Sequence, residues 1–467
     1  MKRFIKILCE VFFLASWMMI FNSCANQQPP SGGDDDKTPP KIIQVSPANN
    51  TTMFTGNSIR FYFDEYVNRR SFEEAFKISP MPKGRPEFDW GAKDVEVIFQ
   101  GGFDRNKTYS IVITKDFKDI NGSNQLTSPV NFAFSTGDKI DKGSISGKIF
   151  AAGLDRMLVA CYIVNSQNQN SLKPDTLRPD YITQPDETGS YALSNLPNAT
   201  YRLFAFNDDD RSSLYNKDFE KIAVLPSDIT VKDSIKNTGN NFLFQNFDID
   251  VKSKEFFQSL KSDSLNIVFS SIENNASAVP PDSRFYFYFK NTKINKLDVA
   301  DNLKLGDSSA NANVKIAFNW LNDSLLQVFA PENLKQGRTY EFNLKTSSLN
   351  FKRIFKTTSE NQIGNISGSV TFTDTTKILQ GNIQIQLIRK NNPLNRYTLS
   401  LITPGPYKFE NISEGEYILF AFIDVNSSGS YDYGKYFPYE PSEPFFVFDK
   451  ELKSKGMWNT DNVQIVF

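Results

Sequence analysis

The sequence predicts an all-β protein made of four tandem β-sandwich domains. One observation is composition: the 467 residues include 42 Phe and 18 Tyr, and aromatic side chains suit half-buried pleated surfaces. The second is a period-two spacing of apolar residues in short runs, and the third is an internal duplication. A chain of this length is also too long for a single ordinary core.

The duplication appears as four segments that occur twice in the same order. Residues 60–63 (RFYF) recur at 284–287, 104–109 (DRNKTY) at 334–340 (LKQGRTY), 143–147 (GSISG) at 364–368 (GNISG), and 201–206 (YRLFAF) at 417–422 (YILFAF). Chance matches would not keep their order. The sequence therefore predicts an A-B-A′-B′ arrangement, with module A at 41–138, B at 139–240, A′ at 241–360 and B′ at 361–467.

Module A contains short alternating runs separated by Gly, Asn, Asp and Pro. Phe61 and Phe63 share one face of their run, as do Val95, Val97 and Phe99, which is typical of antiparallel strands in a sandwich. The opening PPKIIQVSPAN, the run FYFDEYV and the closing FAFSTG resemble the bacterial Ig-like domain of surface-layer proteins. A′ keeps the strands and has Tyr288-Phe289 in place of the Asp64-Glu65 pair.

Module B begins with ISGKI and continues with DETGSYAL and LPNATYRL, and B′ repeats this order with PGPYKF and ISEGEYIL. This succession of turns and strands resembles the prealbumin-like sandwich of carboxypeptidase regulatory domains and adhesin stalk repeats. That resemblance implies spacer or binding modules.

Residues 1–23 read as an export signal, with Lys2, Arg3 and Lys6 before an apolar run that is too short and interrupted for a confident membrane span. The run ends in FNS-Cys24, which resembles a lipobox, so Cys24 is the expected site of acylation, including palmitate. Phe21 and Asn22 depart from the usual pattern, and an ordinary cleavage site is the alternative. Residues 24–40 are polar and form the expected flexible tether.

This beginning resembles that of Bacteroidota lipoproteins, and the resemblance implies anchoring in the outer membrane. In that group an acidic run such as residues 34–36 is associated with display on the cell surface. A solvated linker is the alternative interpretation.

The composition excludes several kinds of site. The chain has no histidine, which removes the commonest general base and zinc ligand and every Ser-His or Cys-His nucleophile pair. Its formal net charge of −1 gives no nucleic-acid footprint. Cys161 lies in an apolar run and is expected to be a buried, inert thiol. Adjacent Asp64 and Glu65 cannot face each other across a strand as a catalytic pair.

The best candidate site is a calcium loop in B′. Its oxygen donors alternate around Gly429, as in a loop that wraps a hard cation, and they are Asp424, Asn426, Ser428, the Ser430 carbonyl and Asp432. Position 12 is Lys435, so the site is incomplete unless Glu440 or Glu443 folds back. In B the equivalent and weaker candidates are Asp208, Asp210 and Ser212. The alternative is a polar loop held by Asx turns.

Two aromatic runs, 285–289 and 445–448, are interpreted as core and domain contacts, with a sugar platform as the alternative. Residues 431–444 are the expected exposed loop for a partner. The function predicted is a non-catalytic binding or spacer module, with an unknown protein or glycan ligand and contact with the membrane through the lipid. The alternative is an accessory component of a glycan-binding or glycan-processing surface complex.

Overall fold

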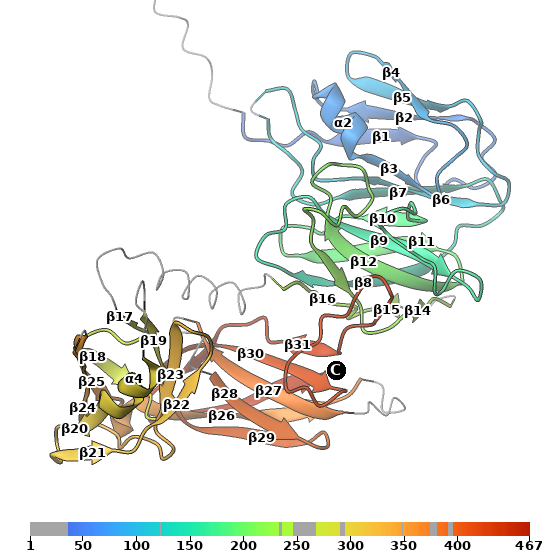
Figure 1. The fold of residues 1–467 in the computed structure, drawn as a ribbon. Helices are drawn as coiled ribbons and strands as arrows, with labels where there is room; N and C mark the ends of the chain where they lie inside the picture. The colour runs from blue at the N-terminus through green and yellow to red at the C-terminus, as the bar shows by residue number, and fades with distance from the viewer. Residues whose placement is uncertain are drawn as a thin grey trace, which may run out of the picture.

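The computed structural model describes residues 36–121, 123–232, 236–245, 268–289, 295–347, 349–373, 381–390 and 396–467. The predicted export signal, Cys24 and most of the tether lie outside these ranges. The described chain is almost entirely β-structure arranged in pairs of sheets (Figure 1). The predicted fold class, tandem β-sandwiches in the order A-B-A′-B′, is confirmed.

Module A packs two antiparallel sheets, with strand orders β1-β2-β5-β4 and β3-β6-β7. The strands are β1 (Ile42–Ser46), β2 (Ser58–Phe63), β3 (Phe76–Ser79), β4 (Pro86–Trp90), β5 (Asp94–Phe99), β6 (Thr108–Ile113) and β7 (Val130–Ser135), with helix α2 (Arg69–Ala75) before β3. Phe61, Phe63, Val95, Val97 and Phe99 are all buried in one core, because alternate residues of a strand face the same side.

Module B also forms two sheets, one of order β10-β9-β12-β13 with β14 on β12, the other of order β11-β8-β15 with β16 on β8. Because β16 pairs with β8, it belongs to module B although it lies just past residue 240, the boundary expected from the sequence. The strands are β8 (Gly143–Phe150), β9 (Met157–Val164), β10 (Tyr181–Thr183), β11 (Ser190–Leu196), β12 (Thr200–Asn207), β13 (Ile222–Val224), β14 (Ile229–Thr230), β15 (Lys236–Asn237) and β16 (Phe242–Leu243). Cys161 lies within this core and is fully buried, and burial raises the pKa of its thiol well above the usual value. The buried thiol expected from the sequence is therefore confirmed.

Module A′ repeats the strand orders of A and adds one strand at each edge of the second sheet, β18 and β21. Its sheets are β17-β19-β23-β22 and β18-β25-β24-β20-β21. The strands are β17 (Val268–Ser270), β18 (Ala276–Val279), β19 (Phe285–Phe289), β20 (Leu303–Asp307), β21 (Ala312–Val314), β22 (Ala317–Trp320), β23 (Leu325–Phe329), β24 (Thr339–Lys345) and β25 (Asn350–Thr357), with helix α4 (Lys296–Asn302) before β20. Phe285, Phe287 and Phe289 belong to its core, so the core interpretation of this aromatic run is confirmed.

Module B′ repeats the strand orders of B, as β28-β27-β30-β31 with β32 on β30, and β29-β26-β33. The elements are η2 (Glu360–Gln362), β26 (Ile363–Thr371), β27 (Asn382–Arg389), β28 (Arg396–Leu401), β29 (Pro406–Ser413), β30 (Gly415–Asp424), β31 (Phe445–Val447), β32 (Leu452–Ser454) and β33 (Asn459–Val466). In both copies a central strand, β8 or β26, pairs in parallel with strands from the end of its module.

The repeated sequence motifs have a shared structural cause. The Tyr109 hydroxyl accepts a hydrogen bond from the Asp104 amide at 2.8 Å, and the Tyr340 hydroxyl accepts one from the Lys335 amide at 2.8 Å. Each tyrosine thereby closes the turn before its own strand. Each tyrosine hydroxyl is buried and needs this partner, because an unpaired buried polar group is costly.

The glycines of the two Ser-Gly motifs are also required by packing. A Cβ added at Gly147 would lie 1.9 Å from the Asn240 carbonyl oxygen, and one added at Gly368 would lie 1.7 Å from the Val463 carbonyl oxygen. Only glycine fits where two backbones approach so closely.

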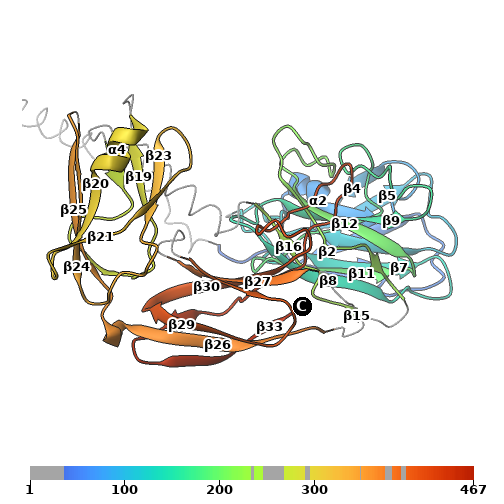
Figure 2. The ribbon, with the colours of Figure 1, turned by 60° about the horizontal axis from the view of Figure 1, so that its bottom comes forward.

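Module A stacks on B, and B′ lies between B and A′ (Figures 1 and 2). The second pair of modules therefore does not simply continue the line of the first. Within the described residues no helix is long and apolar enough to cross a membrane.

Candidate functional site

The predicted calcium loop of B′ follows β30 directly and is folded around the carboxylate of Asp424. This side chain is 2% exposed, and its two oxygens accept hydrogen bonds from the amides of Ser428 at 2.9 Å and Gly429 at 3.0 Å. The Ser428 hydroxyl donates to the Ser430 carbonyl at 2.8 Å. The Asn426 amide nitrogen donates to Asp432 at 2.6 Å. The structure therefore brings all five predicted residues into one loop.

The equivalent loop of B is built in the same way after β12. Asp208, 7% exposed, accepts from the Ser213 amide at 2.9 Å. Asp210 accepts from the Ser212 amide at 2.9 Å, and the Ser212 hydroxyl donates to the Leu214 carbonyl at 3.1 Å. The duplication thus extends to the hydrogen bonds of the loop, although the sequence has changed.

Each loop is closed by a buried glutamate. Glu443 accepts from the Val425 amide at 2.8 Å and from the Asp432 amide at 3.1 Å. Glu220 accepts from the Asp209 amide at 2.9 Å and from the Asn216 amide at 2.7 Å. Glu443 is one of the two residues expected to fold back onto the B′ loop. Glu220 was not predicted from the sequence, although a glutamate follows the aspartate-containing loop in both copies.

Burial disfavours the charged form of these carboxylates. Desolvation raises the pKa of Glu220 and Glu443, and the nearby aspartates add to the effect. Desolvation also raises the pKa of Asp208, although its bond to Ser213 and the ammonium of Lys77 oppose the shift. By contrast, hydrogen bonds from Ser212 lower the pKa of Asp210.

The donor set suits a hard cation better in B than in B′. Carboxylate oxygens of Asp208, Asp210 and Glu220 lie within 4.8 Å of one another, and clustered oxygens of this kind are the ligands that Ca²⁺ takes. In the described part of B′, no group of three acidic side chains meets that limit. The sequence ranked the two loops in the opposite order.

A second group of carboxylates, Asp36, Glu65 and Asp119, meets where the chain enters module A. Asp119 is buried, and both its oxygens accept hydrogen bonds from Asn124. Asp64 accepts from the Lys41 amide at 2.8 Å. Asp64 and Asp119 therefore have structural hydrogen-bond partners within module A.

The B loop lies at the junction between A and B. Arg211 forms an ion pair with Glu74 of α2, and the Lys77 ammonium donates to the Ser213 hydroxyl at 3.2 Å. A third contact between the modules, outside the loop, joins the Lys115 backbone amide to the Gln184 side chain at 2.9 Å. The loop thus fixes one module against the next.

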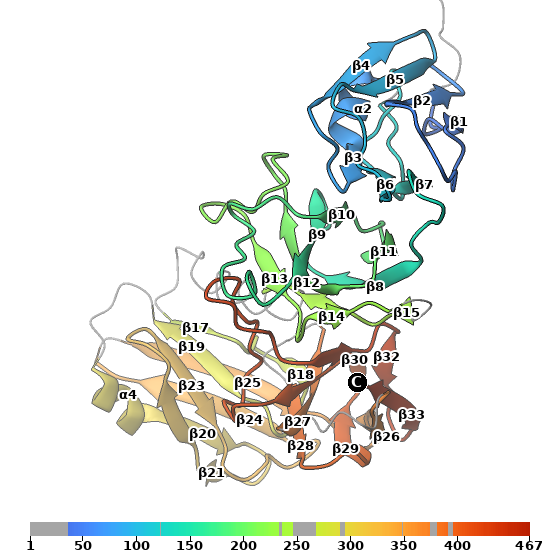
Figure 3. The same ribbon diagram turned by 90° about the vertical axis from the view of Figure 1, so that its right-hand side faces the viewer.

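Residues 431–444 lie at the junction between B and B′, shown by the red-brown loop beside the green strands in Figure 3. Tyr436 and Tyr439 pack against an outer apolar cluster of B. The Arg202 guanidinium lies 3.5 Å from the centre of the Tyr439 ring. Part of the segment expected to recognise a foreign partner therefore contacts module B of its own chain.

A shared apolar cluster seals the same junction. Module B contributes two residues and B′ contributes four, and the cluster comprises Phe150, Leu243, Ile388, Phe420, Phe422 and Phe445. The rings of Phe150 and Phe445 meet edge to face at 5.8 Å. The aromatic run at 445–448 thus divides between this contact and the B′ core, as the core and domain-contact interpretation predicted.

Among known protein families, the one described as bacterial Ig-like domain matches residues 36–136. This match confirms the resemblance stated for module A and indicates a structural or binding module. No curated protein matches the chain.

Several solved structures are distantly similar. One is surface-layer protein SbsC, domains 1–6, with 10% identity over 89% of this chain and 66% of that chain and a TM-score of 0.18. Another is the Bacillus anthracis TIE protein, with 11% identity over 94% and 75% and a TM-score of 0.16. An L,D-transpeptidase from Mycobacterium smegmatis gives 14% identity over 44% and 90% and a TM-score of 0.17. At these scores the likenesses carry no argument about function.

Proposed function

We propose that this chain is a non-catalytic spacer and binding module of the cell envelope, anchored in the outer membrane by lipid on Cys24. The observation that carries the proposal is the packing of residues 431–444 and the B–B′ apolar cluster. A string of independent domains would leave these junctions open. Sealed junctions instead hold the modules in a fixed order and direction, which a spacer needs.

The buried ion pair behind Tyr439 supports a rigid B–B′ junction. Arg202 is 5% exposed, and it donates to both oxygens of Asp228 at 2.8 Å while its face covers the Tyr439 ring. A bidentate pair fixes the guanidinium plane, so the ring that stacks on it has one preferred position. The corresponding B′ residue, Ile418, offers no such clamp.

We also propose that B and B′ are prealbumin-like domains and that the protein is a Bacteroidota lipoprotein. The shared strand order of B and B′ supports their common ancestry. We further propose that calcium binds at the acidic loops. Because the B loop already contacts A and the B′ loop precedes the segment that contacts B, a bound cation would stiffen both junctions.

Small-angle scattering of the chain without residues 1–24 tests the rigid arrangement. The expected curve fits a single conformation with B′ against B, and it changes toward a more extended, mixed population in Tyr439→Ala. A wild-type curve that only a flexible string of modules can fit would contradict the proposal.

Labelling cells with a palmitate analogue tests the anchor. Label is expected on the wild-type protein and lost in Cys24→Ser, which should leave the membrane fraction. Protease treatment of intact cells then distinguishes display on the cell surface from a periplasmic position. Labelling that persists in Cys24→Ser would contradict lipidation at this residue.

A further inference from the structure

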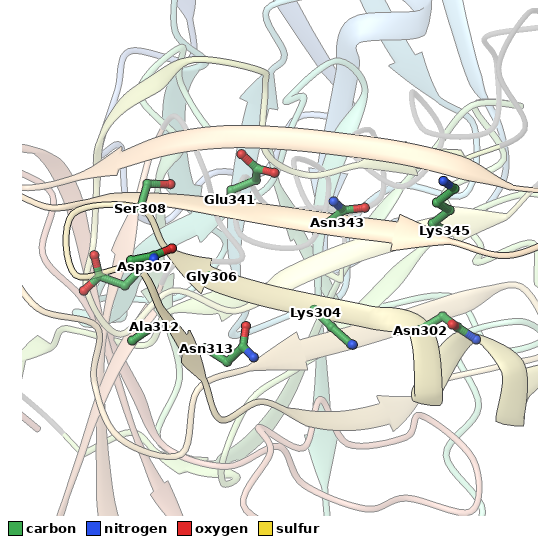
Figure 4. A pocket seen from close by; sticks show the side chains of 11 residues that line it. Asn302, Lys304, Gly306, Asp307, Ser308, Ala312, Asn313, Glu341, Asn343 and Lys345 are labelled. Atoms are coloured by element: carbon green, nitrogen blue, oxygen red, sulfur yellow. The ribbon is translucent and has the colours of Figure 1, made fainter.

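The outer face of the β18-β25-β24-β20-β21 sheet in A′ carries an open hollow of about 830 Å³. Figure 4 shows Lys304 on β20, Asn313 on β21, and Asn343 and Lys345 on β24 around it. Register places Gly306 between Asn313 on one side and Glu341 on the other. The hollow thus runs across three neighbouring strands.

Gly306 has no structural reason to be glycine. A Cβ added there would meet nothing closer than the Ala312 carbonyl oxygen at 3.9 Å and the Glu341 carbonyl oxygen at 4.0 Å. Unlike Gly147 and Gly368, it does not face another backbone at close range. Glycine within a strand weakens the strand, so its presence here is best explained by the open space that it leaves.

The side chains around the hollow are polar and available. Lys304, Asn313, Asn343 and Lys345 are exposed, and no hydrogen bond or ion pair to another described residue engages their side chains. The acidic neighbour Glu341 is paired with Lys352 at 2.9 Å. The face therefore presents unpaired ammonium groups in a chain whose net charge is −1.

The equivalent face of module A is closed. There β10 and β11 of B contact β3 and β6, and Lys77, Ser79, Ser110 and Val112 are largely covered. In A′ the corresponding residues are Lys304, Gly306, Glu341 and Asn343. Charged and amide groups have replaced a hydroxyl and an apolar side chain, which makes dry packing of another β-module costly.

We propose that this face binds an acidic polysaccharide, that is, an extended hydroxyl-rich chain carrying carboxylates. Lysines pair with carboxylates, and asparagine amides both donate to and accept from hydroxyls. The notch at Gly306 lets such a chain approach the sheet. This inference adds a ligand to the proposed binding module, and it can fail while the rigid spacer remains correct.

Binding to immobilised protein, measured by interferometry, tests the assignment with three polymers of similar length. Polygalacturonate carries both carboxylates and hydroxyls, dextran only hydroxyls, and polyglutamate only carboxylates. Polygalacturonate is expected to bind most tightly, with an affinity that falls as salt rises. Equal binding of polyglutamate, or equal or tighter binding of dextran, would overturn the assignment, as would no binding of polygalacturonate.

Variants locate the site. Lys304→Glu with Lys345→Glu, and separately Gly306→Phe, should each weaken polygalacturonate binding by about tenfold or more. The matched control is Lys142→Glu with Lys232→Glu, which changes net charge equally at exposed positions of module B and should leave the affinity unchanged.

Circular dichroism and thermal unfolding establish that each variant is folded. Folded Gly306→Phe protein that binds as well as wild type would refute the site. Equal weakening of binding in the control variant, Lys142→Glu with Lys232→Glu, would also refute the site, because binding would then depend only on the net charge of the protein.

Discussion

The two A-type modules share their strands but use the same sheet face in opposite ways. In A, the outer face of β3 and β6 is covered by B, and Lys77 is buried enough that desolvation lowers its pKa. In A′, the equivalent Lys304 is exposed beside a hollow. The two copies therefore share the interior contacts that define the fold, whereas their outer sheet surfaces differ in sequence and in what covers them.

The B-type modules also share interior contacts and differ at their surfaces. Both retain the glycine–backbone contact, the loop around a buried aspartate and the glutamate that closes it. Among the described residues of the two modules, B carries the Arg202 clamp and B′ carries the long segment that contacts it. Substitutions that break a buried hydrogen bond are costly, because they leave a buried polar group without a partner. Surface positions tolerate substitution.

The sharpest test of this comparison exchanges equivalent residues between the two faces. Val112 is 4% exposed although it lies outside the core of module A, so Val112→Asn should bury an unsatisfied amide at the A–B junction. We expect a loss of about 3 kcal/mol. Urea unfolding with hydrogen exchange resolved to the β6 amides would measure it.

The reciprocal variant is Asn343→Val on the open face of A′. It should change the free energy of unfolding by no more than about 0.5 kcal/mol, because the position is solvated. Similar costs at both positions would mean that the two faces are equally covered, and the comparison would fail.

A smaller effect is expected at the B–B′ junction. Tyr439→Ala removes a ring that stacks on Arg202 and meets Phe204 at 6.2 Å, and we expect a loss of about 2 kcal/mol. Phe437 is the matched control, since it is 39% exposed and has the Lys173 ammonium over its ring. Phe437→Ala should cost less than about 1 kcal/mol. The outcome that breaks the argument is a larger loss for Phe437→Ala than for Tyr439→Ala, measured by urea unfolding.

The acidic loops predict a calcium effect that depends on pH. Burial raises the pKa of Glu220 and Glu443 above the usual 4.5, and that of Asp208 above 3.8. The stabilisation from their protonated forms is complete below those usual values and is lost as pH rises through the folded pKa values. A cation that binds the ionised carboxylates would offset this loss.

Thermal unfolding with calcium or chelator measures the offset. At ten times the dissociation constant, calcium should add about 1.4 kcal/mol at pH 7.5 and much less at pH 4.5. Asp208→Asn should remove the contribution of the B loop, while Asp218→Asn, an exposed neighbour, should not. Identical midpoints with 10 mM calcium and with chelator at pH 7.5 would dismiss calcium at both loops.

The fold class could be predicted from the sequence because it depends on local residue patterns. Alternation at Phe61 and Phe63 and the ordered repeats predicted sandwiches in the order A-B-A′-B′, and the structure confirms both. The glycines of the Ser-Gly motifs were visible as repeats. Their cause, contact with Asn240 and Val463 at the far end of each module, needed three dimensions.

The site was predicted less completely because its parts are distant in sequence. Counting to position 12 of a calcium loop finds Lys435, whereas Glu443 closes the loop after a longer segment. In B, Glu220 closes the loop after a shorter segment. Nor could local pattern show that residues 431–444 would contact B, or that the face around Gly306 would stay open, since both depend on how modules pack.

The last prediction concerns Gly306 itself. Gly306→Ala places a methyl group at ordinary van der Waals distance from its neighbours and reduces the conformational entropy of the unfolded chain. It should therefore stabilise A′ by about 0.5–1 kcal/mol, measured by urea unfolding, and weaken polygalacturonate binding less than Gly306→Phe does. The contrast is Gly147→Ala, which would clash with a backbone oxygen and destabilise B. A loss of stability in Gly306→Ala would show that glycine is needed for packing, and the distinction between a closed face in A and a functional hollow in A′ would lose its basis.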